Sequence, residues 1–374
     1  MGFSLIISQF DEHNEVTIML AKKFNVINIV MLVQKEDLPK IRELKKIEDT
    51  LYIEEVILEP GDSDCIKDTI DSKKDRDILI NLTGGERINS LILLKIAIEL
   101  KLQSIYVDLL NKKRYILGEN FRVIKEQLED MTIEDITKLA GANIVDDSSY
   151  LCSKKEIVDL TKEILRHLEL WHKYKQRLYD NNTFKHDYKD TSKVIINKYL
   201  LSKEELTIVS NTLKYLKETG GLEYYNKGSE IFVTFKNNYL KGFLFKSGTW
   251  LEVLTNVVIN EIKEVDEVKS SVIFLWSEGA KRVRNELDVI AVKDSVLLCI
   301  SCKDSDKYDE NALNELEVYS NRLGGPKAIK ILVATKQPIK VSVIDRAKEM
   351  GINLVIVDKN IDAFKKKLTS IIKK

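Results

Sequence analysis

Cysteine is scarce in this sequence: its 374 residues contain only four. The four thiols, at Cys65, Cys152, Cys299 and Cys302, are too few and too scattered to form the disulfide framework of a small secreted domain. Cys299 and Cys302 form a CxxC pair, but residues at an odd spacing point to opposite faces of a strand. Because no second pair accompanies them, the sequence also argues against a zinc site.

An excess of charge of one sign is also lacking, since 59 Lys and Arg residues balance 59 Asp and Glu residues. The chain therefore has no general attraction to nucleic acid, and any such contact must come from local basic patches. Apolar runs of membrane-spanning length are missing, and the N-terminal residues lack a basic leader and a cleavage signal. We therefore expect a cytoplasmic protein that has no membrane partner.

What is present indicates an α/β protein of two or three domains, because 374 residues exceed what one hydrophobic core normally organises. Residues 1–147 alternate between strand-forming and helix-forming segments, which predicts a mostly parallel sheet with helices on both faces. The expected strands are 5–8, 26–33, 52–58, 77–82 and 104–109, and the expected helices are 14–23, 38–50, 64–72 and 86–100. In such a sheet, ligands bind beyond the carboxyl ends of the strands, where strand order reverses.

Two loops at such carboxyl ends carry suitable residues, namely 81–87 (Asn-Leu-Thr-Gly-Gly-Glu-Arg) and 8–14 (Ser-Gln-Phe-Asp-Glu-His-Asn). Gly84 and Gly85 allow close approach of the backbone, free amides at the helix start attract phosphate, and Arg87 adds a charged fork. The second loop offers polar groups for a base or a ribose. On its own, a Gly-Gly pair before a helix is more often an ordinary turn. No GxGxxG fingerprint is present, which argues against a nicotinamide dinucleotide.

Residues 148–238 are rich in helix formers with scattered aromatic residues. Helical spacing over 154–179 and 201–218, followed by a hairpin pattern over 222–235, is similar to a winged helix. Such a module either grips DNA or serves as a structural spacer, and we expect the spacer. Trp171 and Tyr174 are accordingly expected to pack within the module rather than to stack on bases.

The last segment, residues 239–374, contains two apolar runs separated by a short polar break. The two runs are 285–292 and 296–303. This pattern is typical of an antiparallel hairpin, and a turn centred on Asp294 sets Asp288 opposite Ile300 or Ser301. Farther along, strands at 328–335 and 353–357 are joined through a helix and are expected to be parallel.

Alternation along the hairpin strands brings charged groups to one end of a small sheet. Glu286 and Asp288 share one face of the first strand, and Ser301 and Lys303 share one face of the second. Carboxylates that hold a divalent ion beside a lysine suit metal-assisted hydrolysis of a phosphodiester. The alternative is an exposed hairpin whose charges merely face water.

The same residues resemble a known nuclease core. Asp288, the turn and the Xaa-Xaa-Lys that ends at Lys303 resemble the PD-(D/E)xK fold, and Asn-Glu-Leu-Asp at 285–288 is similar to the form in CRISPR-associated CARF nucleases. The resemblance implies that Mn²⁺ or Mg²⁺ is held by Asp288 together with Glu252 and Glu286. Ser301 stands where the family has an acidic residue, so Glu286 or Glu252 would have to complete the site. The implied catalytic residues are Asp288, Lys303, Glu286 and Ser301.

The pattern Asn-Xaa-Thr-Gly-Gly-Xaa-basic at 81–87 resembles the motif of CARF domains. These are Rossmann-like sensors that dimerise and bind cyclic oligoadenylate across the dimer interface. The resemblance implies ligand contacts from Ser8, Gln9, Asn81, Thr83, Gly84, Gly85 and Arg87. Glu86 replaces a small hydroxyl residue there, and its carboxylate is expected to point away from the ligand phosphates.

Together, the resemblances imply a CARF sensor at 1–147, a winged-helix-like linker at 148–238 and a PD-(D/E)xK nuclease domain at 239–374. The expected protein is a homodimeric, metal-dependent nuclease of type III CRISPR immunity, activated by cyclic oligoadenylate, with cyclic tetra-adenylate as the expected ring. The implied substrates are single-stranded DNA and RNA, and duplex DNA is a candidate for nicking. Two alternatives stay open: a ligand-responsive DNA-binding regulator with a degenerate nuclease domain, and a restriction-type nuclease that needs no second messenger.

Overall fold

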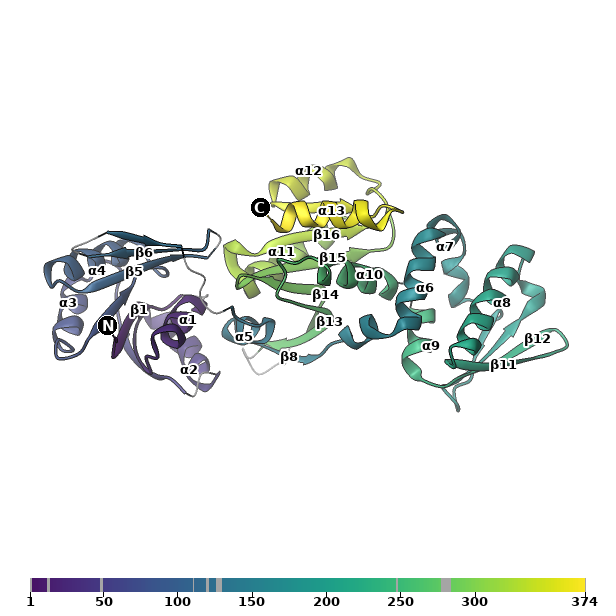
Figure 1. Cartoon of the computed structure of the whole chain (residues 1–374), viewed down its shortest axis with the longest axis horizontal. Coiled ribbons are helices and arrows are strands. Elements are labelled where there is room, and N and C mark those ends of the chain that lie inside the picture. Colours follow the sequence, from purple (N-terminus) through teal and green to yellow (C-terminus); the bar gives the residue numbers. More distant parts are fainter. Residues whose placement is uncertain are drawn as a thin grey trace.

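The computed structural model is an elongated α/β molecule built around three β-sheets (Figure 1). A seven-stranded sheet, a six-stranded sheet and a four-stranded sheet follow one another along its long axis. The structure describes residues 2–11, 14–47, 50–109, 111–118, 121–125, 130–246, 248–276 and 284–373.

The first sheet is parallel at its centre, as the alternation of strands and helices predicts. In spatial order its strands are β3 (Tyr52–Ile57), β2 (Asn28–Val33), β1 (Leu5–Gln9), β4 (Ile78–Asn81), β5 (Gln103–Asp108), β6 (Lys113–Leu117) and β7 (Arg122–Ile124). Strands β3 to β5 run parallel, and β6 and β7 are antiparallel additions at one edge. Strand order reverses between β1 and β4, so their carboxyl ends open a crevice of the kind that binds ligands.

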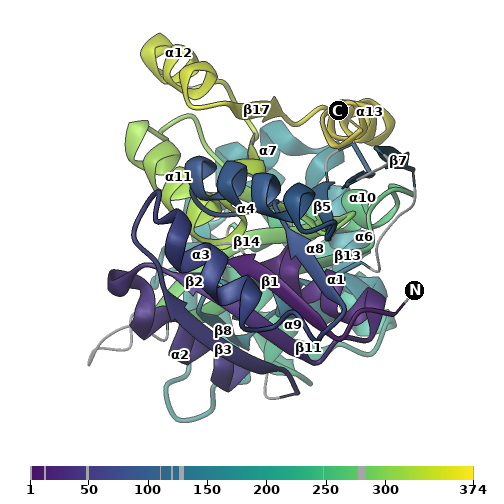
Figure 2. The ribbon, with the colours of Figure 1, turned by 90° about the vertical axis from the view of Figure 1, so that its left-hand side faces the viewer.

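Helices cover both faces of this sheet because its strands are apolar on both sides. The helices are α1 (Glu15–Phe24), α2 (Leu38–Ile47), α3 (Ser63–Asp71) and α4 (Arg87–Glu99). Ile6 of β1 belongs to the core under α1 and α2, whereas Leu5 and Ile7 belong to the core under α3 and α4. Seen from this end of the molecule, α3 and α4 lie side by side (Figure 2).

The four-stranded sheet belongs to a separate module with its own helices. Its antiparallel strands are, in order, β11 (Leu222–Lys227), β12 (Glu230–Phe235), β10 (Lys193–Asn197) and β9 (Phe184–His186). Its helices are α6 (Lys155–Arg166), α7 (Leu168–Tyr174), α8 (Lys203–Glu218) and α9 (Asn238–Phe245). The sequence predicts the β11–β12 hairpin and α8, but β9 and β10 are short and have little local pattern. The predicted helix 154–179 is broken at His167, between α6 and α7.

The six-stranded sheet holds the hairpin that the sequence singles out. Its strands are, in order, β17 (Ile352–Ile356), β16 (Ile329–Ala334), β15 (Val296–Lys303), β14 (Arg284–Lys293), β13 (Glu267–Trp276) and β8 (Ala142–Asp146). Strands β15, β16 and β17 are parallel, and β14 and β15 form an antiparallel hairpin. Asp294 and Ser295 connect them with positive φ of 52° and 62°, the backbone of the two-residue turns that fit hairpin twist.

Two groups of helices cover this sheet. Helices α10 (Thr249–Asn260) and α13 (Ile361–Ile372) pack on one face, and α5 (Ile133–Leu139), α11 (Glu310–Gly324) and α12 (Val341–Glu349) pack on the other. The strands alternate accordingly, with Val289 and Ala291 under α10 and with Ile290 and Val292 under α11. From Val289 to Val292, this alternation fixes which side chains of β14 point to each face.

The boundary at residue 147 differs from the structure. Helix α5 and strand β8 precede that boundary but belong to the six-stranded sheet, where β8 pairs with β13. Residues 148–238, together with α9, therefore form a module inserted between two parts of the same sheet. A short edge strand gains its partner only through long-range pairing, so the local pattern around residue 142 could not reveal it.

The seven-stranded and six-stranded sheets also share one apolar cluster. The cluster includes Ile18 and Met31 from the first domain. It also includes Ile136 from α5, and Leu287 and Leu313 from the six-stranded domain. The first domain is thus packed against the six-stranded domain rather than tethered loosely to it. Among the described residues, no helix is long and apolar enough to cross a membrane.

Candidate functional site

The β14–β15 hairpin brings Asp288, Ser301 and Lys303 together as the sequence predicts. Val289 pairs with Ile300, which sets Asp288 beside Ser301. The Ser301 hydroxyl donates to Asp288 Oδ2 at 3.1 Å, and the Cys302 backbone N–H donates to the same oxygen at 2.6 Å. Lys303 Nζ lies 4.0 Å from Asp288 Oδ2. Two hydrogen-bond donors and a cation therefore surround one oxygen of Asp288 and fix the orientation of its carboxylate.

Glu252 reaches the same place from helix α10. Its side chain is buried, with the residue only 8% exposed, and it accepts a hydrogen bond from the Ser271 hydroxyl. Burial, aided by the nearby negative charge of Asp288, raises the pKa of Glu252 to about 7. A buried carboxyl whose pKa is raised by a neighbouring carboxylate marks a place where extra positive charge would be stabilising.

A cavity of about 310 Å³ opens where these groups meet. Its walls are Lys246, Glu252, Glu286, Leu287, Asp288, Ser301, Lys303, Glu315, Leu316 and Tyr319. All five residues that the sequence assigns to the nuclease site line this one cavity. Glu286 is exposed and lies on its outer part, whereas Glu252 and Ser301 are buried.

Sequence reasoning missed five residues of the cavity wall, of which three are polar: Lys246, Glu315 and Tyr319. Glu315 and Tyr319 lie one turn apart on α11, and the Tyr319 hydroxyl accepts a hydrogen bond from Asn285 at 2.6 Å. Their helical spacing is visible in the sequence, but which face of α11 meets the hairpin is a tertiary fact. Lys246 precedes α10, and its charge favours the ionised form of Glu252 and so opposes the rise in the pKa of that carboxyl.

Asp304, next to Lys303, anchors this end of β15 to the inserted module. Its Oδ2 accepts hydrogen bonds from the indoles of Trp171 at 2.7 Å and Trp250 at 3.0 Å, and its Oδ1 lies 3.0 Å from His172 Nε2. Lys175 Nζ lies 3.0 Å from Oδ2. The indole donors and Lys175 outweigh burial and lower the pKa of Asp304. Trp171 thus packs against the six-stranded domain, in line with a structural rather than a base-stacking role.

The residues present fit a divalent cation. Glu252 and Asp288 are two carboxyl groups close enough for the charge of one to raise the pKa of the other. Hard cations such as Mg²⁺ and Mn²⁺ prefer such oxygen ligands. The second oxygen of Asp288 has no hydrogen bond to Ser301 or Cys302, which both bond to Oδ2.

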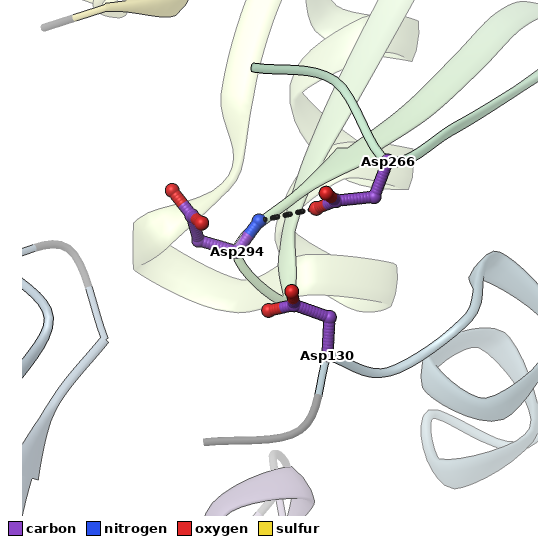
Figure 3. Close-up of side chains that lie close together, drawn as sticks. All are labelled: Asp130, Asp266 and Asp294. Atoms are coloured by element: carbon purple, nitrogen blue, oxygen red, sulfur yellow. Dashed lines mark hydrogen bonds between the residues drawn. The ribbon is translucent and has the colours of Figure 1, made fainter. Parts of the chain in front are cut away.

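Another acidic group lies at the other end of the hairpin. Asp130, Asp266 and Asp294 each offer an oxygen within 4.8 Å of the others (Figure 3). The backbone N–H of Asp294 donates to Asp266 at 2.7 Å, and Lys112 of the first domain lies 2.6 Å from the Asp294 carboxylate. The hydrogen bond with Asp294 raises the pKa of Lys112. Lys112 thus supplies a cation to this group, which acts as a contact between the first domain and the hairpin turn.

The predicted ligand loops of the first domain meet at the carboxyl ends of β1 and β4. The hydroxyls of Ser8 and Thr17 lie 2.9 Å apart, and the Asn81 amide donates to both at 3.1 Å. Thr83 Oγ1 accepts from the Val107 backbone at 3.0 Å. Ser8 and Asn81 are 1% exposed, so they brace the crevice from beneath.

The Gly84–Gly85 turn is packed closely against the first loop. A Cβ on Gly84 would lie 2.4 Å from a carboxylate oxygen of Asp11, and a Cβ on Gly85 would lie 2.4 Å from Cβ of Gln9. Gly85 also has a φ of 81°, which L side chains rarely adopt. Its amide donates to Asp11 Oδ2 at 3.2 Å. The Asp11 carboxylate therefore accepts a hydrogen bond from the Gly85 amide, which the sequence predicts to bind a ligand phosphate.

A second cavity, of about 170 Å³, lies beside this turn. Its walls are Gln9, Asp11, Glu15, Val16, Thr17, Asn81, Thr83, Gly84, Gly324, Pro326 and Lys327. Of the predicted ligand residues, Gln9, Asn81, Thr83 and Gly84 line it, whereas Ser8, Gly85 and Arg87 do not. Arg87 begins α4 and is exposed, and Glu86 is exposed too. Gly324, Pro326 and Lys327 come from the six-stranded domain.

Comparison with known proteins assigns the last domain. Residues 241–373 match the family model described as "Card1-like, endonuclease domain". The match covers the hairpin, α10 and α11, and therefore every residue that lines the 310 Å³ cavity. No curated protein matches this chain in sequence.

Solved structures resemble the entire chain. Protein VC1899 from Vibrio cholerae aligns with a TM-score of 0.78 at 20% identity, over 99% of this chain and 97% of that one. Can2 from Sulfobacillus thermosulfidooxidans, solved with cyclic tetra-adenylate, aligns with a TM-score of 0.72 at 16% identity, over 100% of this chain and 98% of that one. A type III CRISPR defence DNA nuclease activated by cyclic oligoadenylate aligns with a TM-score of 0.52 at 14% identity, over 92% of this chain and 48% of that one. These likenesses establish the fold of the whole chain.

Proposed function

We propose that this chain, which joins a CARF-type first domain to a Card1-like endonuclease domain, is a divalent-metal-dependent nuclease switched on by cyclic oligoadenylate. The observation that carries the proposal is the group formed by Glu252, Asp288 and Lys303 in one cavity. A buried carboxyl with a raised pKa, a second carboxylate and a lysine are what phosphodiester hydrolysis needs in one place.

Glu252 and Asp288 would hold the cation, with Glu286 at the outer part of the cavity as a further oxygen ligand. A bound divalent cation supplies a water of lowered pKa and neutralises charge on the scissile phosphate. The Ser301 hydroxyl and the Cys302 amide orient the Asp288 carboxylate. With a pKa of about 7, Glu252 is partly protonated near neutral pH, and a bound cation would favour its ionised form.

Lys303 supplies the mobile positive charge of the site. Its ammonium lies 4.0 Å from Asp288, and the side chain is 31% exposed, so it can reach a phosphate at the cavity mouth. A lysine there binds the phosphate as a point charge and stabilises the charge that develops during cleavage. Ser301, which takes the place of an acidic residue, orients Asp288 by hydrogen bonding and provides no charge of its own.

The proposed activator is cyclic tetra-adenylate, since Can2 has the same fold and was solved with that ligand. The proposed substrates are single-stranded DNA and RNA, with nicking of duplex DNA as a further activity to be measured. The 59 basic and 59 acidic residues give no general affinity for nucleic acid, so the cavity and its rim must provide it. The proposed ligand contacts are those of the 81–87 loop and the loop after β1.

One assay tests the proposal against its alternatives. Labelled single-stranded DNA, RNA and supercoiled plasmid are incubated with Mn²⁺ or Mg²⁺, with and without cyclic tetra-adenylate, for the parent and Asp288→Ala. Cleavage that needs both metal and ligand and is lost in Asp288→Ala supports the proposal. Cleavage independent of the ligand indicates a restriction-type nuclease, and ligand-modulated binding without cleavage indicates a regulator.

A further inference from the structure

We infer that Lys327 of the endonuclease domain binds an anionic group of the activator in the sensor pocket, so that the nuclease domain contacts the ligand directly. The inference rests on the proposed function, because it takes the 170 Å³ cavity as part of the activator site. It adds a residue that lies far from both sensor loops in the sequence and belongs to a different domain.

The pocket is built by both domains. The sensor provides Gln9, Thr83 and Gly84, and the turn after α11 provides Gly324, Pro326 and Lys327. This turn is a short 3-10 helix, η5 (Gly325–Lys327), in which Gly325 has a φ of 64° and is buried. Its backbone is therefore fixed, and Lys327 is carried at a defined position on the pocket wall.

The charges of the pocket explain why this lysine matters. Asp11 and Glu15 both line it, and Glu15 is only 7% exposed. Burial raises the pKa of Glu15 to about 7. A phosphate entering such a pocket meets two carboxyl groups, which disfavour an anion. Lys327 is the basic residue of the described pocket wall, and its Nζ lies 4.0 Å from Glu15 Oε1.

A ligand anion can replace two carboxylates at their present partners. These are Asp11 at the Gly85 amide and Glu15 at the Lys327 ammonium. Asp11 accepts a hydrogen bond from the Gly85 amide at 3.2 Å, so this amide already serves an anionic oxygen. Lys327 is 37% exposed and only loosely paired with Glu15, which leaves it able to turn toward a phosphate. The pocket wall thus offers a phosphate the ammonium of Lys327, and the Gly85 amide, which is not part of that wall, becomes available only if Asp11 moves away from it.

Helix α11 connects this pocket with the nuclease cavity. Its fifteen residues span about 22 Å. Glu315 and Tyr319 line the nuclease cavity, and Gly324 lines the sensor pocket. A Cβ on Gly324 would lie 3.1 Å from Cβ of Leu297, so the end of α11 is in close contact with β15. We therefore expect a shift of this turn to strain β15, the strand that carries Lys303, because close-packed interiors transmit strain.

A simpler role for Lys327 is that of a tether between the domains through Glu15. The two roles predict different variants. If the pair is only a tether, Lys327→Ala and Glu15→Gln remove the same contact and have the same effect. If Lys327 binds the ligand, Lys327→Ala weakens binding whereas Glu15→Gln keeps or tightens it, because the substitution removes a negative charge from the pocket.

The experiment measures binding of cyclic tetra-adenylate by calorimetry, and ligand-activated cleavage, for the full chain and four variants. Lys327→Ala should weaken binding roughly ten- to hundred-fold, the range of a charge-assisted hydrogen bond. Lys327→Arg should restore most of the affinity. The matched control is Lys348→Ala, which removes a lysine of the same domain that is also loosely ion-paired, 3.9 Å from Asp345 on the surface. It should bind like the parent.

Each contrary result has one meaning. Parent-like binding by Lys327→Ala, or an equal loss in Lys327→Ala and Glu15→Gln, would overturn the inference while the proposed function stands. Full recovery of the cleavage rate in Lys327→Ala at saturating ligand would overturn α11 as the connection. Absence of binding by the parent would overturn the proposed function and the inference with it.

Discussion

Glu252 combines burial, a hydrogen bond from Ser271 and a pKa of about 7. Its pKa in the folded protein lies above the ordinary value of 4.5, so the folded state binds the proton more tightly than the unfolded state does. The resulting stability is fully present below pH 4.5 and is lost as pH rises through about 7. Ionised Glu252 therefore destabilises the metal-free protein, which is the cost of keeping a carboxylate ready for a cation.

The first prediction follows from the destabilising effect of ionised Glu252. In the presence of a chelator at pH 8, Glu252→Gln should raise the free energy of unfolding by on the order of 3 kcal/mol, because it removes the penalty of the ionised carboxyl. The gain should vanish at pH 4. The same substitution should abolish metal-dependent cleavage. Chemical denaturation at the two pH values measures the first effect, and a destabilised variant at pH 8 would contradict it.

Ser301 gives the second prediction. Its hydroxyl donates to Asp288, and the residue is 8% exposed. Ser301→Glu should tighten Mn²⁺ binding several-fold, since it adds a carboxylate beside Glu252, Asp288 and Glu286. Without metal, the same variant should be less stable than the parent, because one more negative group then shares the cavity with four other carboxyl groups.

Calorimetric titration with Mn²⁺ measures this effect. Ser301→Ala is the control, since it removes the hydrogen bond without adding charge and should bind Mn²⁺ much as the parent does. Unchanged or weaker Mn²⁺ binding in Ser301→Glu would mean that this position faces away from the metal.

At the scale of single elements, Asp304 holds the end of β15 to helices α7 and α10. Its side chain is 5% exposed and accepts from two indoles and one ammonium. Asp304→Ala would leave those donors buried without a partner. We predict a loss of about 3–5 kcal/mol in the free energy of unfolding. Cleavage should fall as well, because Lys303 is the neighbouring residue. Asp345→Ala, at an exposed ion pair, should change stability by less than about 0.5 kcal/mol.

The pH dependence of this anchor runs opposite to that of Glu252. The pKa of Asp304 is lowered in the folded protein, so its stabilising effect is present above the ordinary value of 3.8 and is lost as pH falls below it. Acid denaturation of the parent should therefore be steeper near that pH than acid denaturation of Asp304→Ala. Equal acid profiles would show that the carboxylate is not what holds α7 to the sheet.

At the scale of the whole molecule, the size of the sensor cavity bears on whether the protein forms a dimer. The sensor cavity has about 170 Å³, below the roughly 300 Å³ of ordinary small-molecule pockets, and a ring of four nucleotides is larger still. One chain can therefore enclose only part of such a ligand. A ring of identical units is best matched by two identical surfaces, so we predict an isologous dimer through the first domain. Light scattering with and without cyclic tetra-adenylate tests this, and a monomer in both conditions would refute it.

The sequence by itself determined the parts that depend on local pattern. Alternating apolar segments predicted the parallel strands β1 to β5, and two apolar runs around Asp294 predicted the β14–β15 hairpin, with Asp288 opposite either Ile300 or Ser301. Alternation along those strands was enough to bring Asp288, Ser301 and Lys303 together, because side-chain direction in a strand repeats with period two. The glycine turn after β4 was visible for the same local reason.

Only the tertiary structure decided which distant segments meet. Strand β8 joins the six-stranded sheet, and Trp171 of the inserted module bonds to Asp304 beside the site. Lys327 reaches the sensor pocket through the packing of α11, and Tyr319 reaches the nuclease cavity from the same helix. None of these contacts has a local signature, because a helix shows in its sequence that it has a buried face but not what that face is packed against.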